Sequence, residues 1–106
     1  PDGLAPDATI RNVTVFAEAE VDRSPCGSGT SALLAARHAL GASQVGDTVV
    51  NAGITGESFV ATVEGTTTIG EHEAIITSIE GNGYVTGHAR FVHDERDRLG
   101  RGFLLR

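Results

Sequence analysis

The segment Ser31–Leu40 constrains the fold of this chain most, because it predicts a helix that is apolar on almost every side. Its sequence, SALLAARHAL, contains strong helix formers and no β-branched residue, and Gly41 follows it as a natural C-terminal cap. A helix that is apolar all round is usually buried all round. The chain has only 106 residues, room for one compact domain, so the sequence predicts strands wrapped around one central helix.

Glycines divide the rest of the chain into short apolar runs, a pattern typical of strands. Gly53, Gly56 and Gly65 are expected at bends or bulges. The predicted class is therefore α+β, with a solvated turn over Asp94–Arg101 and a last apolar run over Gly102–Arg106. The expected strands are Thr9–Ala17, Thr48–Ala52, Ser58–Glu64, Thr66–Ile69, Glu73–Ile79 and Tyr84–His93.

Composition excludes several classes of function. Eight basic and 14 acidic residues give a net charge of −6, which argues against binding nucleic acid or an anionic membrane surface. No apolar run approaches the length needed to span a bilayer. A single cysteine excludes an internal disulfide, a CxxC pair and a cysteine-rich zinc site, so we expect a reducing compartment, the cytoplasm.

The chain contains no methionine, even at its first position, and it opens with Pro1-Asp2-Gly3. Such an opening is unusual for a complete translation product. We therefore expect the sequence to be a piece of a longer protein.

The chemistry-bearing segment is Asp22–Thr30, a polar, glycine-rich turn that leads directly into the predicted helix. The first amides of a helix have no acceptor within the helix, and the helix dipole adds partial positive charge there. Gly27 and Gly29 carry no side chain that would keep a ligand off the backbone. The turn is therefore predicted to hold an anion the size of a carboxylate or a phosphate.

Cys26 stands at the edge of this predicted anion site, where a helix N-terminus favours the thiolate. Asp22 precedes it by four residues and is placed to accept a proton or hold an ammonium group. Thiol, carboxylate and anion site together suit proton transfer at the Cα of an amino acid. On the residues alone a second interpretation stays open: a lone cysteine is often a small buried apolar residue.

The motif Asp22–Ala32, DRSPCGSGTSA, resembles the second cysteine motif of the proline racemase family, whose usual form is DRSPCGTGTSA. The single difference is Ser28 in place of threonine. Flanking segments resemble the same family: Asn12–Phe16, Glu57–Val60 and Gly83–Gly87. The resemblance covers essentially this whole chain but only the C-terminal part of the family's length.

The resemblance implies a fold like that of diaminopimelate epimerase, in which each of two lobes is a strongly curved, mostly antiparallel sheet around a central helix. Residues 1–106 would be the C-terminal lobe, with the final strand, about 102–106, packing on the missing lobe. Two cysteines, one per lobe, would exchange the Cα proton of proline or hydroxyproline without a cofactor or metal. Cys26 would be one of them, Asp22 would contact the substrate amine, and Gly27, Ser28 and Gly29 would hold its carboxylate.

Three alternatives accompany this interpretation. The family's trans-3-hydroxyproline dehydratases resemble this motif with threonine in place of cysteine, so Cys26 favours a racemase or epimerase. A non-catalytic lobe that binds a small carboxylate would retain the anion site without turnover. A homodimer would place two Cys26 helices face to face, whereas the 106-residue chain by itself is expected to be inactive because it lacks the opposing acid.

Overall fold

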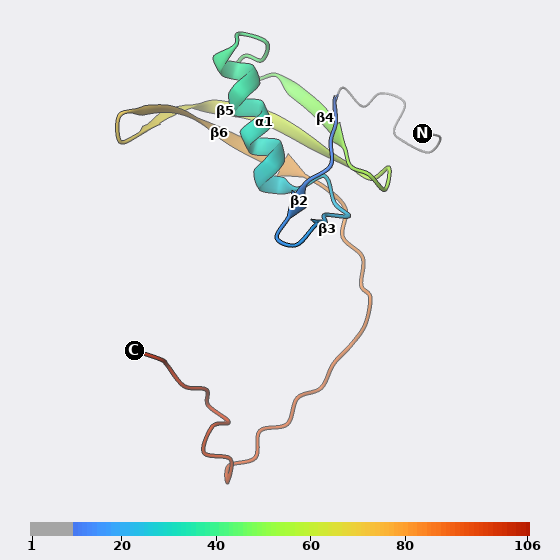
Figure 1. The fold of residues 1–106 in the computed structure, drawn as a ribbon, viewed down its shortest axis with the longest axis vertical. Helices are drawn as coiled ribbons and strands as arrows, with labels where there is room; N and C mark the ends of the chain where they lie inside the picture. The colour runs from blue at the N-terminus through green and yellow to red at the C-terminus, as the bar shows by residue number, and fades with distance from the viewer. Residues whose placement is uncertain (1–9) are drawn as a thin grey trace.

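The computed structural model describes residues 10–106, which form one α-helix and two small β-sheets (Figure 1). The α+β class expected from the sequence is confirmed. No helix among these residues is long and apolar enough to cross a membrane. In chain order the elements are β1 (Ile10–Arg11), β2 (Val15–Phe16), β3 (Glu20–Val21), α1 (Gly27–Ala39), β4 (Thr48–Ala52), β5 (Ser58–Ile69) and β6 (His72–Glu80).

The larger sheet has the strand order β1-β4-β5-β6 and is mostly antiparallel, as predicted. Only β1 runs parallel to its neighbour, β4. Strands β5 and β6 form a long hairpin whose two-residue turn begins with Gly70, at a φ of 60° that favours glycine. The pairing register shifts between Val63 and Gly65, so the predicted bulge near Gly65 is confirmed. This bulge joins two predicted strands into the single strand β5.

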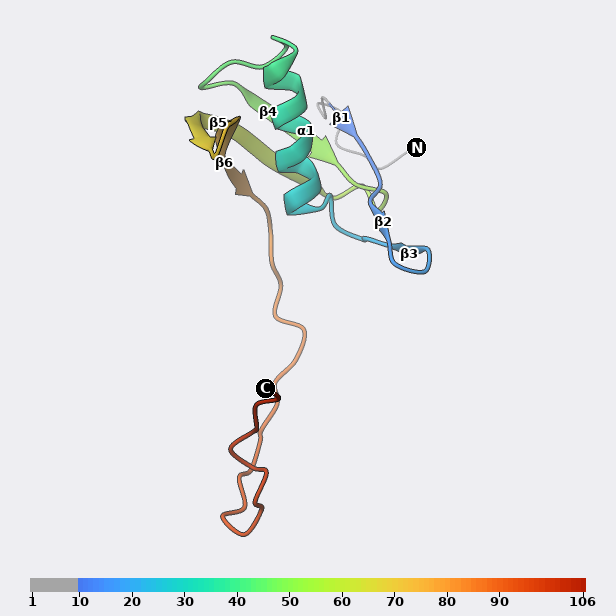
Figure 2. The same ribbon diagram turned by 60° about the vertical axis from the view of Figure 1, so that its left-hand side comes forward.

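The helix α1 lies across one face of this sheet (Figure 2). Leu34 is completely buried and packs with Val49, Ala61 and Val63 of strands β4 and β5. Thr30, one helical turn earlier, is buried on the same face.

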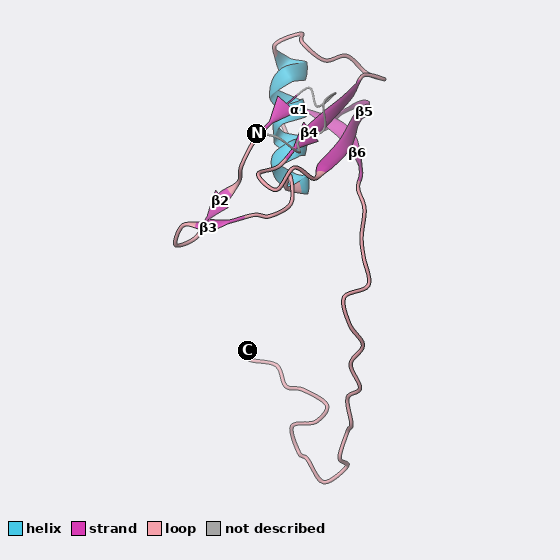
Figure 3. Ribbon diagram, turned by 90° about the vertical axis from the view of Figure 1, so that its right-hand side faces the viewer, coloured by secondary structure: helices cyan, strands magenta, loops and turns pink. Residues whose placement is uncertain are grey.

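The expectation that the helix would be buried on all sides is wrong for this chain. Ala32, Ala35, Ala36, Ala39 and Leu40 are exposed, although all five are apolar. The reason is that a single sheet covers one side of the helix, and no second layer of the described chain covers the other (Figure 3).

The predicted strand Thr9–Ala17 is interrupted in the structure, and Thr9 lies outside the described residues. Strand β1 ends at Arg11, and the chain then leaves the sheet for the small β2-β3 hairpin (Figure 3). Ala17 and Ala19 in the hairpin loop both have positive φ, which lets the chain reverse direction within a few residues. Two short strands therefore replace one.

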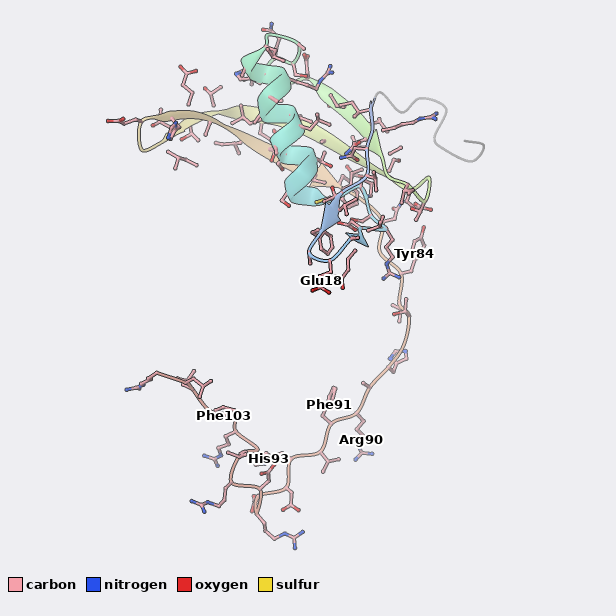
Figure 4. The ribbon with its side chains drawn as sticks, viewed as in Figure 1. Glu18, Tyr84, Arg90, Phe91, His93 and Phe103 are labelled. Atoms are coloured by element: carbon pink, nitrogen blue, oxygen red, sulfur yellow. The ribbon has the colours of Figure 1, made fainter. Side chains whose placement is uncertain are left out.

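The predicted strand Tyr84–His93 is also absent from the described chain, because no neighbouring strand is present to pair with it. After β6 the backbone runs away from the sheet, and Tyr84, Phe91 and Phe103 lie along this exposed segment (Figure 4). The radius of gyration of 19.2 Å reflects this extension, since a compact domain of this length has about 13 Å. The charged stretch from Asp94 to Arg101 is a solvent-exposed turn, as expected.

The burial of Leu34 predicts which helix residue stabilises the fold. Leu34→Ala should lower the free energy of unfolding by about 2–5 kcal/mol, because it leaves a cavity between helix and sheet. Leu40→Ala, a matched truncation at an exposed position, should change it by less than about 0.5 kcal/mol. Urea unfolding followed by circular dichroism measures both, and equal losses would contradict the packing described.

Candidate active site

Cys26 is the N-cap residue of α1, and the helix begins at Gly27, four residues before the predicted start. The Cys26 Sγ accepts the N–H of Gly29 at 3.3 Å, which is the hydrogen bond expected of an N-cap side chain. The Thr30 N–H donates to the Cys26 carbonyl at 2.9 Å, so the Gly-Ser-Gly turn is already helical. The thiol therefore stands on the first turn of the helix.

The backbone of Cys26 adopts a φ of 65° and a ψ of 116°, a conformation that residues other than glycine rarely adopt. Such a conformation costs about 1–3 kcal/mol and persists only where its surroundings enforce it. Here both backbone polar groups of Cys26 are held. Its N–H donates to Ser24 Oγ at 3.0 Å, and its carbonyl accepts the Thr30 hydroxyl at 2.6 Å.

Three donors surround the sulfur of Cys26 and hold the pKa of the thiol below its ordinary value. The largest contribution comes from the Ser28 hydroxyl, whose Oγ lies 3.6 Å from Sγ, followed by the Gly29 N–H and the Thr14 hydroxyl. Partial burial and the negative charge of Asp22 oppose this effect and raise the pKa. The donors prevail because hydrogen bonds to the sulfur favour its charged form.

Asp22 is fixed at the entrance to the same turn. Its Oδ1 accepts the Ser24 N–H at 2.8 Å, and this bond is the main reason that the pKa of its carboxyl group is lowered. Hydrogen bonds with the side chains of Ser24 and Cys26 and the charge of Arg23 act in the same direction. Asp22 is therefore a carboxylate at neutral pH, held beside the thiol.

The first turn of α1 has two free N–H groups at the predicted anion site. The Gly29 N–H is already taken by Cys26 Sγ, so it is not free to bind a ligand. The N–H groups of Gly27 and Ser28 have no acceptor within residues 10–106, and both residues are exposed. Two adjacent free N–H groups at a helix N-terminus suit one carboxylate.

Gly29 also provides space beside the thiol. A Cβ at Gly29 would lie 3.2 Å from Cys26 Sγ and 3.2 Å from Thr14 Oγ1, closer than ordinary contacts. Its missing side chain therefore makes room for the thiol and for Thr14. A Cβ at Gly27, by contrast, would have nothing within 4 Å.

Three residues of this site were not found from the sequence: Thr14, Thr30 and Asn51. Thr14 reaches the sulfur from the segment before β2, and Asn51 reaches Thr30 from β4. Thr30 belongs to the motif, but the sequence does not indicate its contact with Asn51. A sequence signal for Asn51 was its spacing of two residues from Val49 in the predicted strand Thr48–Ala52, which places both on one face.

Two grooves of the described chain have linings that do not include the residues of this site. A groove of about 480 Å³ separates the C-terminal half of α1 from the β5-β6 hairpin and is lined by Ala35, His38 and Thr67 among others. His38 is partly buried, and its Nδ1 lies 2.9 Å from the Ser43 carbonyl. Within residues 10–106 no cluster of three or more His, Cys, Asp or Glu side chains could hold a metal ion. The Cys26 site is thus a one-sided surface that bears a thiol, a carboxylate and two free N–H groups.

Comparison with known proteins identifies the class of protein that this surface belongs to. A sequence model described as "Proline racemase" matches residues 2–104. A trans-3-hydroxy-L-proline dehydratase of Bacillus cereus is 48% identical over 99 residues, which are 93% of this chain and 30% of the relative. A proline racemase of Clostridioides difficile is 44% identical over 101 residues, which are 95% of this chain and 30% of the relative.

Solved structures agree with the sequence comparison. A hydroxyproline epimerase from Agrobacterium vitis with bound trans-4-OH-L-proline superimposes with a TM-score of 0.75 at 39% identity, over 96% of this chain and 29% of that one. A probable proline racemase from Agrobacterium radiobacter K84 with bound carbonate gives a TM-score of 0.73 at 37% identity, over 90% of this chain and 28% of that one. The chain belongs to the proline racemase family and spans about 30% of the length of the relatives it matches.

The hydrogen bonds at Sγ predict a reactive thiol. Because the pKa of Cys26 is lowered, its alkylation by iodoacetamide should reach half-maximal rate at a lower pH than that of a free cysteine. Ser28→Ala should move this midpoint upward and slow alkylation at pH 7 by about two- to tenfold, through loss of one hydrogen bond to the thiolate.

Ser31→Ala is the matched control for this measurement. Ser31 lies three residues after Ser28 on the same helix. Its hydroxyl forms a hydrogen bond of 2.9 Å with Thr77 Oγ1 of β6 and does not contact the sulfur. The control should keep the wild-type midpoint. A Ser28→Ala midpoint equal to wild type would contradict the assignment.

Proposed function

We propose that the complete protein containing this chain racemises or epimerises proline or hydroxyproline at Cα, with Cys26 as one of two acid/base residues. The observation that carries this proposal is the Cys26 thiol itself. It lies at a helix N-cap with a lowered pKa, beside an ionised Asp22 and two free N–H groups. Each of these groups matches one part of an α-amino acid: its Cα–H, its ammonium and its carboxylate.

The reaction needs one group on each face of Cα. The Cys26 thiolate takes the Cα proton, the C–H electron pair moves into the substrate carboxylate, and a thiol on the opposite face returns a proton to Cα. Cys26 ends protonated and the opposing sulfur ends as a thiolate, so charge and protons balance. Two N–H groups at the helix N-terminus stabilise the charge that develops on the carboxylate.

The roles of the remaining residues follow from the same placement. The substrate carboxylate binds the N–H groups of Gly27 and Ser28, and Gly29 leaves space beside the sulfur. Asp22 holds the substrate ammonium. The thiol must stay reduced to act as a base, which fits a reducing compartment such as the cytoplasm.

The opposing thiol comes from a part of the protein outside this chain. The chain covers about 30% of its relatives' length, which leaves room for a second lobe. We assign residues 1–106 to the C-terminal lobe of a two-lobed fold like that of diaminopimelate epimerase. The missing lobe would cover the exposed apolar side of α1 and pack on the last segment, about 102–106, where Phe103, Leu104 and Leu105 are exposed.

A trans-3-hydroxyproline dehydratase is the second candidate function, and the 48% identity to the Bacillus cereus dehydratase favours it. A dehydratase removes the Cα proton and expels the 3-hydroxyl group as water, so it needs no second proton donor at Cα. The thiol at position 26 favours the racemase, because the family resemblance of the motif implies threonine at this position in a dehydratase. Incubating the complete protein with trans-3-hydroxy-L-proline and with L-proline separates the two, by loss of water in one case and inversion in the other.

Replacement of the thiol tests the proposal directly. In the complete protein, Cys26→Ser should lower kcat for inversion by about 10²- to 10⁴-fold, the usual contribution of a general acid/base. KM should change little, because the N–H groups and Asp22 remain. Thr48→Ala, at an exposed position whose hydroxyl lies 3.1 Å from the Thr62 hydroxyl, should leave kcat unchanged. A Cys26→Ser protein with wild-type kcat would overturn the proposal.

The 106-residue chain by itself should not invert proline, because it has one base and no opposing acid. The optical rotation of an L-proline solution containing the chain measures inversion, and a steady change in rotation would contradict the prediction. Gel filtration at high concentration then decides whether paired copies supply the second thiol.

The reactivity of the Cys26 thiol in the complete protein distinguishes a racemase from a non-catalytic lobe that only binds a carboxylate. Pyrrole-2-carboxylate, a planar mimic of proline, should protect Cys26 from iodoacetamide if the thiol faces the substrate. An unreactive thiol would favour the carboxylate-binding alternative.

A further inference from the structure

We propose that the end of strand β4 and the turn after it position Cys26, through Asn51, Gly53 and Thr55. This inference rests on the proposed function, because it concerns how the thiol of that site is held. The three residues are alternate positions along the chain, and each contacts a different part of the segment from Arg23 to Thr30. None of the three is a hydrogen-bond partner of the Cys26 sulfur, so they act as positioning residues.

Asn51 makes the central contact. It is completely buried, and its Nδ2 donates to Thr30 Oγ1 at 2.7 Å. Thr30, also completely buried, donates its hydroxyl to the Cys26 carbonyl at 2.6 Å. A continuous path of two short hydrogen bonds therefore runs from the sheet to the backbone of Cys26.

Gly53 and Thr55 hold the part of the turn before Cys26. A Cβ at Gly53 would lie 3.1 Å from the Ser24 carbonyl carbon and 3.1 Å from the Pro25 nitrogen, so the two backbones touch. The Thr55 hydroxyl donates to the Arg23 carbonyl at 2.9 Å. Together with Asn51, which contacts Thr30, these two residues hold the chain on both sides of Cys26.

The cost of these contacts indicates a role beyond folding. The Asn51 Oδ1 is buried without a partner among the described residues, and an unsatisfied buried oxygen destabilises a fold. An apolar residue at this position would avoid that cost. Departures of this kind are expected where a site must hold a strained conformation, here the φ of 65° at Cys26.

The conformation of Cys26 in turn decides what reaches its sulfur. The Gly29 N–H and the Ser28 hydroxyl are fixed on the helix, and they meet Sγ only while Cys26 keeps its present backbone angles. Loss of the Thr30 or Asn51 hydrogen bond releases the Cys26 carbonyl from one side. The thiol then spends less time near its donors and becomes less acidic.

The test uses Thr30→Val and Asn51→Leu in the complete protein, with Thr30→Ser as the conservative variant that retains the hydroxyl. Iodoacetamide labelling of the peptide containing Cys26, read by mass spectrometry across pH, isolates this thiol from any other cysteine. Thr30→Val and Asn51→Leu should slow labelling at pH 7 by about three- to tenfold and move its midpoint upward. Thr30→Ser should keep the wild-type profile.

Val49→Ala is the matched control for destabilisation, because Val49 is buried in the same strand two residues away and contacts the core. It should lower the melting temperature without moving the pH profile. Gly53→Ala is an independent variant that keeps every hydrogen-bonding side chain and should also slow labelling. The proposal is overturned if Thr30→Val and Gly53→Ala, while folded, keep the wild-type profile, or if Val49→Ala shifts it equally.

This test separates the positioning role from the proposed function. A protein that fails to invert proline, but whose Cys26 profile shifts in Thr30→Val, would refute the racemase and retain the positioning. A protein that inverts proline with an unchanged profile in Thr30→Val would retain the racemase and refute the positioning.

Discussion

One face of the helix α1 supports both the fold and the candidate site. Leu34 and Thr30 are one turn apart and are the two buried residues of the helix. Leu34 packs into the apolar core of the sheet, whereas Thr30 meets Asn51 through a hydrogen bond of 2.7 Å. The apolar contact fixes where the helix lies, and the polar contact fixes where its first turn begins. The position of Cys26 follows from both.

Local features of the fold were predictable because they depend on neighbouring residues. Strand β4 has the predicted bounds, Thr48–Ala52, and the helix was expected within a few residues of its observed end at Ala39. The bulge at Gly65 was expected from glycine within a strand. Long-range features were not predictable in the same way. The apolar residues of Tyr84–His93 indicated a strand, but a strand forms only where a partner is present, and the described chain supplies none.

In the candidate site, too, the residues close together in sequence were predictable and the contacts between separate segments were not. Cys26, Asp22 and the glycines lie within eight residues of one another, so the motif displays them together. Thr14 meets the motif through the β2-β3 hairpin, where the Asp22 N–H donates to the Thr14 carbonyl at 2.9 Å. Asn51 comes from β4, 21 residues after its partner Thr30. The sequence also could not reveal that Gly29 donates to the thiol, since that depends on the backbone angles of Cys26.

Those backbone angles restrict which amino acids position 26 accepts. A residue branched at Cβ is poorly tolerated at a φ of 65°, whereas cysteine has a single non-hydrogen substituent, Sγ, on Cβ. Placing threonine there would strain the turn unless the chain around it relaxed. An exchange of cysteine for threonine at this position therefore requires adjustments in the residues that shape the turn.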